Sequence, residues 1–343
     1  MRYLVLTDIH GNIDALEAVL AAAGPVDAHL VMGDVVGYGA GPNEVITRVR
    51  GLAPVAIIRG NHDKVIAGVE LPESFNPAAL QSAAWTADTL TAEHREWLAG
   101  LPQGPAIVDD RVEICHGMPS DEDEYLFGPR DAARAFEATR RPLCLFGHTH
   151  VPACYVIDTE TPDLLTVEDL SHGRPTELVL DDTHRFVVNP GAVGQPRDGD
   201  PRAAFAIYDS TARTLTLTRV DYDVERAQQR IRDAGLPDIL ARRLAARRPS
   251  VRPRADGARS RLAGFARLAL LRVGGVGIGR GAGAEDPADH HADEQDGGDE
   301  DEVPRRHVVE VAHGGSQRAG GSRLASVFRS CSARAKRRHS VHR

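Results

Sequence analysis

The first turn of the chain lies in the stretch Thr7-Asp8-Ile9-His10-Gly11-Asn12, which directly follows the apolar run Tyr3–Leu6. Asp8 and His10 are two residues apart, so their side chains leave an extended chain on the same side. A carboxylate oxygen and an imidazole nitrogen that point the same way at a strand end supply half of a metal site. Asn12 can cap the helical pattern that follows. A capped turn alone would also explain this stretch, so the interpretation depends on whether the arrangement recurs.

The composition is that of an ordinary globular protein, and it argues against several classes of function. The chain has 343 residues, which is compatible with one α/β domain of about 250 residues plus an extension. Its net charge of −8 does not favour binding to a nucleic-acid backbone. No apolar run approaches the roughly 18 residues of a membrane span, and the N-terminus carries no basic-then-apolar signal pattern. The four cysteines fit neither a disulfide framework nor a zinc knuckle, so we expect a cytoplasmic protein.

From Tyr3 to about His150, short apolar runs alternate with helical patterns, which is typical of βαβ units around a largely parallel sheet. The expected strands are Tyr3–Leu6, His29–Met32, Val55–Ile58, Val112–Cys115 and Leu143–Phe146. The expected helices are Asp14–Ala23, Asn43–Arg50, Pro77–Thr89, Ala92–Ala99 and Arg130–Ala138. The composition of Asp109-Asp110-Arg111 predicts a hairpin turn between two apolar runs.

After about Ala153, alternating segments replace the helical patterns and indicate antiparallel strands in a second sheet. These segments are Glu177–Leu180, Arg185–Val188, Ala203–Tyr208 and Thr214–Val220. Two closing helices are expected at Asp223–Ala234 and Ile239–Ala246. We therefore place one domain at residues 1–250. We expect residues 251–343 to form a disordered tail, because Gly, Ala, Arg and blocks of charge dominate there and offer little apolar burial.

Polar motifs stand just past the C-terminal end of each expected strand in the first part of the chain. They are Asp8-x-His10, Gly33-Asp34, Gly60-Asn61-His62-Asp63, His116-Gly117 and Gly147-His148-Thr149-His150. Ligands of open α/β sheets bind beyond the carboxyl ends of the strands, so we expect all five motifs at one edge of one sheet. Their oxygen and nitrogen donors suit two divalent ions, with Mn²⁺ as the first choice and Fe, Zn or Ni as alternatives. Two such ions need a shared ligand, and the Asp34 carboxylate is the candidate.

In order and spacing, these five motifs resemble the signature of the calcineurin-like metallophosphoesterase superfamily, and the resemblance covers about residues 1–250. It implies an α/β fold, namely a four-layer α/β/β/α sandwich of two mixed sheets. It also implies that one metal ion is held by Asp8, His10, Asp34 and His150, and a second by Asp34, Asn61, His116 and His148.

The same resemblance implies hydrolysis of phosphate esters. A water that bridges the two ions would lose a proton and become the nucleophile, and the ions would neutralise the phosphoryl oxygens. His62 is not a ligand in the family pattern; it would stand over the substrate and act as general acid towards the departing alkoxide. Asp63 either orients His62 or caps the following helix.

The sequence departs from the protein serine/threonine phosphatase branch, in which the second motif continues into Asp-Arg-Gly. Gly37 and Tyr38 occupy the corresponding positions here, which argues against that branch and against the symmetrical dinucleoside-tetraphosphate hydrolases. The chain is more similar to compact bacterial phosphodiesterases. The segment Asn189–Arg197 is either a substrate-side loop or a structural turn. Tyr38 and Arg197 are the candidates for contact with substrate, and Arg202 is an alternative to Arg197 as a planar fork for phosphate.

We therefore expect a metal-dependent phosphoesterase that hydrolyses a small phosphodiester or phosphomonoester, with nucleotides among the possible substrates. Asymmetric dinucleoside-polyphosphate hydrolysis is one alternative function. A non-catalytic, metal-bound protein-interaction scaffold is another. We expect neither a nucleic-acid backbone nor a membrane as partner, and the sequence leaves the oligomeric state open.

Overall fold

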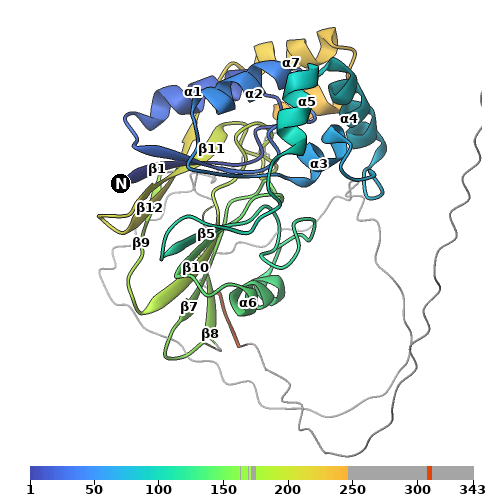
Figure 1. The fold of residues 1–343 in the computed structure, drawn as a ribbon. Helices are drawn as coiled ribbons and strands as arrows, with labels where there is room; N and C mark the ends of the chain where they lie inside the picture. The colour runs from blue at the N-terminus through green and yellow to red at the C-terminus, as the bar shows by residue number, and fades with distance from the viewer. Residues whose placement is uncertain (163, 169, 171–174, 246–306, 311–343) are drawn as a thin grey trace, which may run out of the picture. The chain divides into compact units, whose positions relative to one another are not determined.

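Two β-sheets with helices on their outer faces make up the described part of the chain in the computed structural model (Figure 1). The structure describes residues 1–162, 164–168, 170, 175–245 and 307–310. The predicted four-layer α/β/β/α sandwich is confirmed. Most of the predicted tail lies outside the described residues; within it, strand β13 (His307–Glu310) pairs with β8.

The first sheet has the strand order β3-β2-β1-β11-β12-β9. Its strands are β1 (Arg2–Leu6), β2 (Ala28–Met32), β3 (Ala56–Ile58), β9 (Thr176–Val179), β11 (Ala203–Asp209) and β12 (Thr214–Val220). β1, β2 and β3 are mutually parallel, whereas β11 runs antiparallel to β1 and to β12. The carboxyl ends of β1, β2 and β3 therefore lie at the same edge of this sheet.

The second sheet has the strand order β13-β8-β7-β10-β6-β5-β4. Its remaining strands are β4 (Ala106–Ile107), β5 (Val112–Ile114), β6 (Leu143–Leu145), β7 (Ala153–Asp158), β8 (Leu164–Glu168) and β10 (His184–Asn189). β5, β6 and β10 are parallel, and β4 and β5 form the predicted hairpin. Asp109 closes its turn by accepting hydrogen bonds from the backbone amides of Arg111 and Val112.

The expectation that the first strands all belong to one sheet is wrong, because β5 and β6 lie in the second sheet. The assignment of the later segments to a second sheet is also wrong in part, since β9, β11 and β12 extend the first sheet. Apolar runs that are buried on both faces look alike in sequence and do not reveal their sheet. The long connection between β3 and β5 holds three helices and lets the chain cross from one sheet to the other.

The helices agree closely with the sequence patterns, with one exception. They are α1 (Ile13–Ala23), α2 (Pro42–Gly51), α3 (Asn61–Ala67), α4 (Pro77–Thr89), α5 (Ala92–Ala99), α6 (Pro129–Ala138), α7 (Val224–Asp233) and α8 (Asp238–Leu244). Asn12 caps α1 as predicted by accepting a hydrogen bond from the Ala15 amide at 3.1 Å. A helix was expected only after Asp63, whereas α3 already begins at Asn61, inside the Gly60-Asn61-His62-Asp63 motif.

Alternation along β1 divides its side chains between two cores. Leu4 and Leu6 pack against α1 and α2 on the outer face of the first sheet. Tyr3 and Val5 point the other way and join the apolar layer between the two sheets. A third cluster lies between the second sheet and α6. Both faces of each sheet are thus covered, which fixes the relative placement of the two sets of strand ends.

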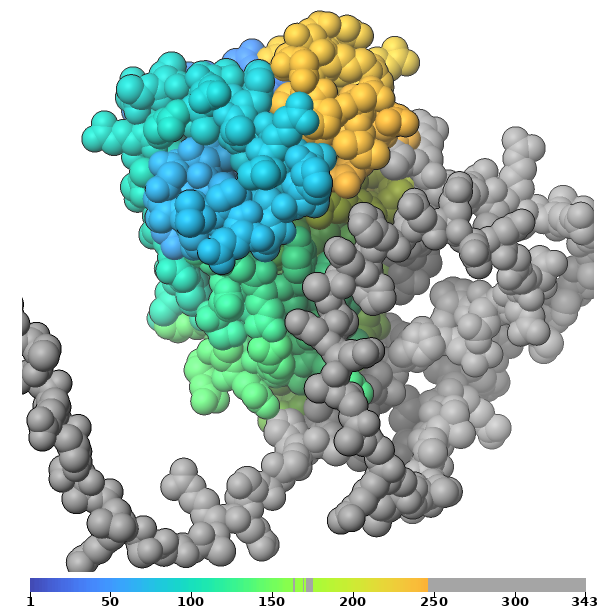
Figure 2. Space-filling view, turned by 90° about the vertical axis from the view of Figure 1, so that its right-hand side faces the viewer, coloured from blue at the N-terminus to red at the C-terminus, as the bar shows by residue number. Residues whose placement is uncertain are grey.

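Helices α7 and α8 pack against the beginning of α4 on the outer side of the first sheet. The space-filling view shows this contact as the orange segment lying beside the blue-to-cyan segment (Figure 2). The shared cluster contains Ala79 of α4, Ile231 of α7, Leu240 of α8 and the side chain of Tyr38. The closing helices therefore reach the loop that follows β2.

Shortening Leu30 to alanine should destabilise the protein, since its side chain is fully buried between the two sheets. We expect Leu30→Ala to cost about 2–5 kcal/mol of unfolding free energy, because a cavity remains in the apolar layer. Leu71→Ala is the matched control, since the Leu71 side chain is 71% exposed, and it should change stability by less than about 0.5 kcal/mol. Urea unfolding followed by circular dichroism measures both, and equal midpoints would contradict the assigned core.

Candidate metal centre

The five polar motifs of the sequence come together at the strand ends of both sheets. Asp8 and His10 follow β1, and Asp34 follows β2. Asn61 and His62 begin α3 directly after β3. From the second sheet, His116 follows β5, and His148 and His150 follow β6. The seven side chains predicted as ligands therefore gather in one place, although two sheets contribute them rather than one.

The backbone of this centre is held in an unusual conformation. Asp8, His10, Asp34, His148 and His150 have φ angles between 49° and 65°. Residues other than glycine seldom adopt this left-handed region, although Asp and His tolerate it better than most. Each such residue costs about 1–3 kcal/mol and persists only where its surroundings enforce it. Backbone hydrogen bonds between loops do so here, for example from the His10 amide to the Asp34 carbonyl at 2.9 Å.

Four of the predicted ligands form the first cluster, in which the donor atoms all lie within 4.8 Å of one another; they are Asp8, His10, Asp34 and His150. The Nε2 atoms of His10 and His150 are 3.1 Å apart. The nearest carboxylate oxygens are Asp34 Oδ2, 3.4 Å from His10 Nε2, and Asp8 Oδ1, 3.4 Å from His150 Nε2. Every member is at least 98% buried.

The second cluster shares Asp34 with the first and adds His116 and His148. Asp34 Oδ2 is 3.5 Å from His116 Nε2, and the amide oxygen of Asn61 is 3.3 Å from the same nitrogen. One carboxylate oxygen thus lies between imidazoles of both clusters. This arrangement suits two cations bridged by Asp34.

Backbone carbonyls select the tautomers of the histidines. Nδ1 of His10, His116 and His150 lies 3.1, 2.8 and 2.7 Å from the carbonyl oxygens of Val36, Met32 and Gln195, respectively. A carbonyl only accepts, so each Nδ1 carries a proton, and the Nε2 of each ring presents a lone pair to the centre when that ring is neutral. His148 is turned the other way: its Nε2 donates to the Asp123 carbonyl at 3.1 Å, which leaves Nδ1 as acceptor.

The donor set fits metal ions on this evidence. Lone pairs of two buried imidazoles 3.1 Å apart repel each other unless a proton or a cation lies between them. Carboxylate oxygens and oriented imidazole nitrogens are together the ligands of Mn, Fe and Zn sites. The Asp/His clusters are therefore consistent with a dinuclear metal site, and the donor set does not select one metal.

The buried acidic and basic groups of the centre shift one another's pKa values. Burial, with a contribution from Asp34, raises the pKa of the Asp8 carboxyl to about 7. Burial opposes protonation of His116, but the neighbouring Asp34 carboxylate raises the pKa of His116 to about 10. Burial lowers the pKa of His148 to about 3 and holds that of His10 well below its usual value. Without a cation, His116 therefore supplies the positive charge that neutralises Asp34.

His62 lies beside the first cluster, in an aromatic setting. Its ring centroid is 4.9 Å from that of His10, 4.4 Å from Tyr38 and 4.5 Å from Phe75. Burial lowers the pKa of His62 to about 4. Gly37 makes room for this ring, because a Cβ atom at Gly37 would lie 2.6 Å from His62 Nδ1. No local pattern in the chain explains the glycine at this position.

Asp63 performs the capping role that was one of its two predicted alternatives. Its carboxylate accepts hydrogen bonds from the backbone amides of Val35, Val36 and Gly60 at 3.0–3.2 Å. No hydrogen bond joins it to His62 among the described residues. Asp63 therefore ties the start of α3 to the loop that carries Asp34. Glycine is required beside it, since a Cβ atom at Gly60 would collide with Asp34 Oδ1.

Of the two arginines considered for substrate, only Arg197 lies at the centre. Its Nη2 is 3.5 Å from the hydroxyl oxygen of Tyr38, and its Cζ is 5.7 Å from the centroid of that ring. Tyr38 is itself 4.7 Å from His10 between ring centroids. Arg202 instead binds the Asp200 carboxylate through Nε and Nη2. Because these donors already bind Asp200, the Arg202 guanidinium does not present them to a phosphate.

Two residues with structural roles at the centre were not singled out from the sequence. The Asn189 side chain donates to the Gly147 carbonyl at 2.7 Å and to Thr149 Oγ1 at 2.9 Å, and so holds the loop between His148 and His150. The ring of Tyr125 stacks on His148 with centroids 3.9 Å apart. The sequence analysis named Asn189 only as the first residue of the segment Asn189–Arg197, and nothing local pointed to Tyr125.

A further cluster of carboxylates, outside the two Asp/His clusters, is explained by ion pairs rather than by metal binding. Glu70, Glu122 and Asp123 lie close enough to hold a cation, but the buried Lys64 ammonium already occupies their midst, 2.8, 3.2 and 2.5 Å from the three carboxylates. Arg59 binds Glu122 as well, at 2.8 Å. This network is an internal ion-pair cluster in which Glu122 and Lys64 are buried.

Comparison with known proteins gives consistent matches. A family model described as the calcineurin-like phosphoesterase superfamily domain matches residues 1–213. An uncharacterized protein of Methanocaldococcus jannaschii is 32% identical over 249 residues, which make up 70% of this chain and 96% of that protein.

Among solved structures, a metallophosphoesterase from Sphaerobacter thermophilus is 41% identical, with a TM-score of 0.62, and the match covers 72% of this chain and 99% of that one. A hypothetical protein from Pyrococcus horikoshii is 22% identical with a TM-score of 0.56, over the same 72% of this chain and 99% of its own, and shows a similar fold.

These matches extend over the whole set of polar motifs and confirm the resemblance seen in the sequence. Within the described ranges, none of the helices combines the length and the apolar character that crossing a membrane requires. By the family model and by both close relatives, the chain belongs to the calcineurin-like phosphoesterase superfamily.

Proposed function

We propose that this protein is a dinuclear-metal-dependent hydrolase of small phosphate esters, acting on a phosphodiester or a phosphomonoester. The observation that carries the proposal is the pair of buried Asp/His clusters that share Asp34. Asp8, His10, Asp34 and His150 would hold one ion, and Asp34, Asn61, His116 and His148 the other. When bound, two such ions would lower the pKa of water and neutralise the charge that builds on phosphoryl oxygens. We propose Mn²⁺ as the native ion, with Fe, Zn or Ni as alternatives.

His62 is proposed as the general acid. Its imidazole is neutral near pH 7 in the metal-free protein, because burial keeps its pKa at about 4. An anionic phosphoryl group beside the ring favours the imidazolium form and so moves this pKa upward. The imidazolium can then give its proton to the departing alkoxide. Asp63 acts on this step only indirectly, through the position of α3 and of the Asp34 loop.

Tyr38 and Arg197 are proposed to contact the substrate. Both stand at the edge of the first cluster, and the Arg197 side chain is exposed while Tyr38 is buried beneath it. A guanidinium group presents donors in a fixed fork that matches phosphate oxygens. The cytoplasmic location stays a prediction, supported by the three buried free cysteines among the described residues.

Two single substitutions separate the proposed metal role from the proposed acid role. Asp34→Asn should release metal from both clusters and bring hydrolysis of bis-p-nitrophenyl phosphate with added Mn²⁺ to background, because the shared ligand is lost. His62→Ala should keep the metal but lower kcat by roughly 10²–10⁴-fold for an ester with a poor leaving group. Metal content by mass spectrometry is measured alongside the rates.

The matched control is Asp88→Asn, an exposed carboxylate on α4, which should equal wild type in both measurements. Equal rates for wild type, Asp34→Asn and His62→Ala would rule out the proposed chemistry. Bound metal without any turnover of phosphodiesters or phosphomonoesters would favour the scaffold alternative.

Metal affinity should rise with pH. His116, with a pKa of about 10, and Asp8, with a pKa of about 7, must lose their protons before they bind a cation. Each proton released makes binding about tenfold tighter per pH unit below the pKa of its group. Mn²⁺ should therefore bind at least about 100-fold more tightly at pH 8 than at pH 6, since His116 is protonated over that whole range. Calorimetric titration in two buffers of different ionisation enthalpy counts the protons, and a constant Kd would contradict the assignment.

Product analysis tests the alternative of asymmetric dinucleoside-polyphosphate hydrolysis. The phosphodiesterase proposal predicts that such a substrate, incubated with the Mn²⁺-loaded protein, is cleaved far more slowly than a simple diester. Chromatography of the nucleotide products reports the bond that is cut. Rapid and unequal cleavage into a nucleoside mono- and triphosphate would favour the alternative instead.

A further inference from the structure

Arg197 has unused hydrogen-bonding capacity next to the metal centre. Its Nη2 makes long hydrogen bonds to the Tyr38 hydroxyl, at 3.5 Å, and to Gln195 Oε1, at 3.3 Å. Tyr125 is a further neighbour of the guanidinium. None of these partners is a carboxylate, and no described residue forms an ion pair with Arg197. Most of its five donors are therefore free to meet a ligand.

A second arginine, Arg243, lies on helix α8. Its helix packs Leu240 and Leu244 against Tyr38, the residue over which Arg197 lies. Arg243 is half-buried, and it makes neither a hydrogen bond nor an ion pair within the described part of the chain. Burial, and then the positive charge of Arg197, lower the pKa of Arg243. Arg197 and Arg243 thus both belong to segments that pack around Tyr38, and neither forms an ion pair with a described carboxylate.

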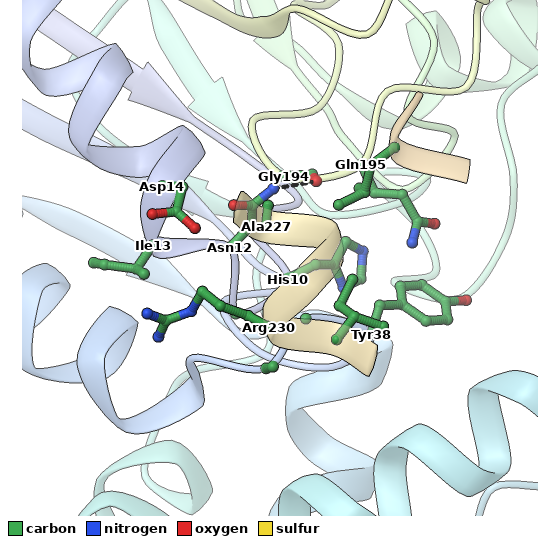
Figure 3. Close-up of a pocket in the computed structure, with 14 residues that line it drawn as sticks. His10, Asn12, Ile13, Asp14, Tyr38, Gly194, Gln195, Ala227 and Arg230 are labelled. Carbon is green, nitrogen blue, oxygen red and sulfur yellow. Dashed lines mark hydrogen bonds between the residues drawn. The ribbon is translucent and has the colours of Figure 1, made fainter. Parts of the chain in front are cut away.

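The side-chain amide of Gln195 is a buried hydrogen-bond donor that has no acceptor in the described part of the chain. Gln195 is 1% exposed, and its Nε2 has no hydrogen-bond partner among the described residues. Gln195 and Tyr38 both line a pocket that also exposes His10 (Figure 3). The Oε1 atom of Gln195 accepts the hydrogen bond from Arg197 Nη2. The amide group thus orients one guanidinium and keeps its own N–H groups free.

No described carboxylate pairs directly with either guanidinium group or with the Gln195 amide. Like charges held close together repel, and a buried donor without an acceptor costs about 1–3 kcal/mol. The nearest carboxylate on α8, Asp238, does not relieve this, because it binds Arg232 and Arg242. An anionic ligand with several oxygens would satisfy both guanidinium groups and the amide at once.

We propose that Arg197, Arg243 and Gln195 form a subsite for a second anionic group of the substrate, a phosphate or a carboxylate, beside the phosphoryl group that is hydrolysed. The subsite adjoins the metal centre through Tyr38, whose ring is 4.7 Å from that of His10 between centroids. The substrate class is then a phosphate ester with an additional anionic group on the alcohol or nucleoside that it carries. This inference rests on the proposed phosphoesterase function for the reacting group.

Two esters with the same leaving group test the subsite. Thymidine 5′-(p-nitrophenyl phosphate) and its 3′-phosphorylated analogue differ only in the second anionic group. The Mn²⁺-loaded wild type should hydrolyse the 3′-phosphorylated ester with a kcat/KM higher by about 10- to 100-fold, as expected for hydrogen bonds between charged partners. Arg243→Gln should remove most of this preference, measured as the ratio of the kcat/KM values of the two esters.

Arg242→Gln is the matched control, since Arg242 is the next residue on the same helix, is exposed and binds Asp238 at 2.9 Å. It should keep the wild-type preference. The subsite is excluded if wild type hydrolyses both esters equally well, or if Arg243→Gln slows both esters to the same extent.

An equilibrium measurement separates the subsite from the proposed chemistry. Both guanidinium groups belong to the chain, so metal-free wild type should still bind thymidine 3′,5′-bisphosphate more tightly than thymidine 5′-monophosphate in calorimetric titrations. Arg243→Gln should abolish the difference, and Arg242→Gln should not. If no ester is hydrolysed but this difference is found, the proposed function fails and the subsite stands. Equal affinities for the two nucleotides in wild type would overturn the subsite.

Discussion

The Asp34 carboxylate stands where the two clusters meet, and the rest of the centre is arranged around it. The Oδ1 atom accepts a hydrogen bond from the His62 backbone amide at 2.9 Å. The Oδ2 atom lies 3.4 Å from His10 Nε2 and 3.5 Å from His116 Nε2. The group is 1% exposed, so solvent does not neutralise its charge. Burial of an uncompensated carboxylate is costly. The surrounding imidazoles offset this cost by binding either protons or cations, in addition to the hydrogen bond from the His62 amide.

The positions of the imidazoles depend on backbone groups from other loops. Carbonyls of Met32 and Val36, on either side of Asp34, hold the rings of His116 and His10. The loop after β10 holds His150 through Gln195. Each motif is therefore oriented by a neighbour from a different strand, and the left-handed backbone of several of them is kept in place by the same cross-links. A change in one loop would therefore displace metal-ligating atoms in both clusters.

The substrate side of the centre is assembled from still more distant parts of the chain. Tyr38 follows β2, Arg197 follows β10, and Arg243 belongs to the last described helix before the tail. Helices α7 and α8 thus do more than cover the first sheet, because they complete the surroundings of Tyr38. In the proposed subsite this placement explains why an arginine on α8 is left without a carboxylate. A ligand with two anionic groups would link the metal centre to these closing helices.

The sequence by itself determined the local features and the family. The cap at Asn12, the Asp109 turn and the bounds of α4 and α5 all follow from residues close together in the chain, and each is found as predicted. The five motifs sufficed to indicate the superfamily, because glycine, aspartate and histidine at strand ends have few other uses in such an order. Only the tertiary structure decided which sheet each strand joins, since pairing between distant, doubly buried strands leaves no local signal. The same holds for Gly37, Asp63 and Arg243, whose roles come from partners that the chain brings together only by folding.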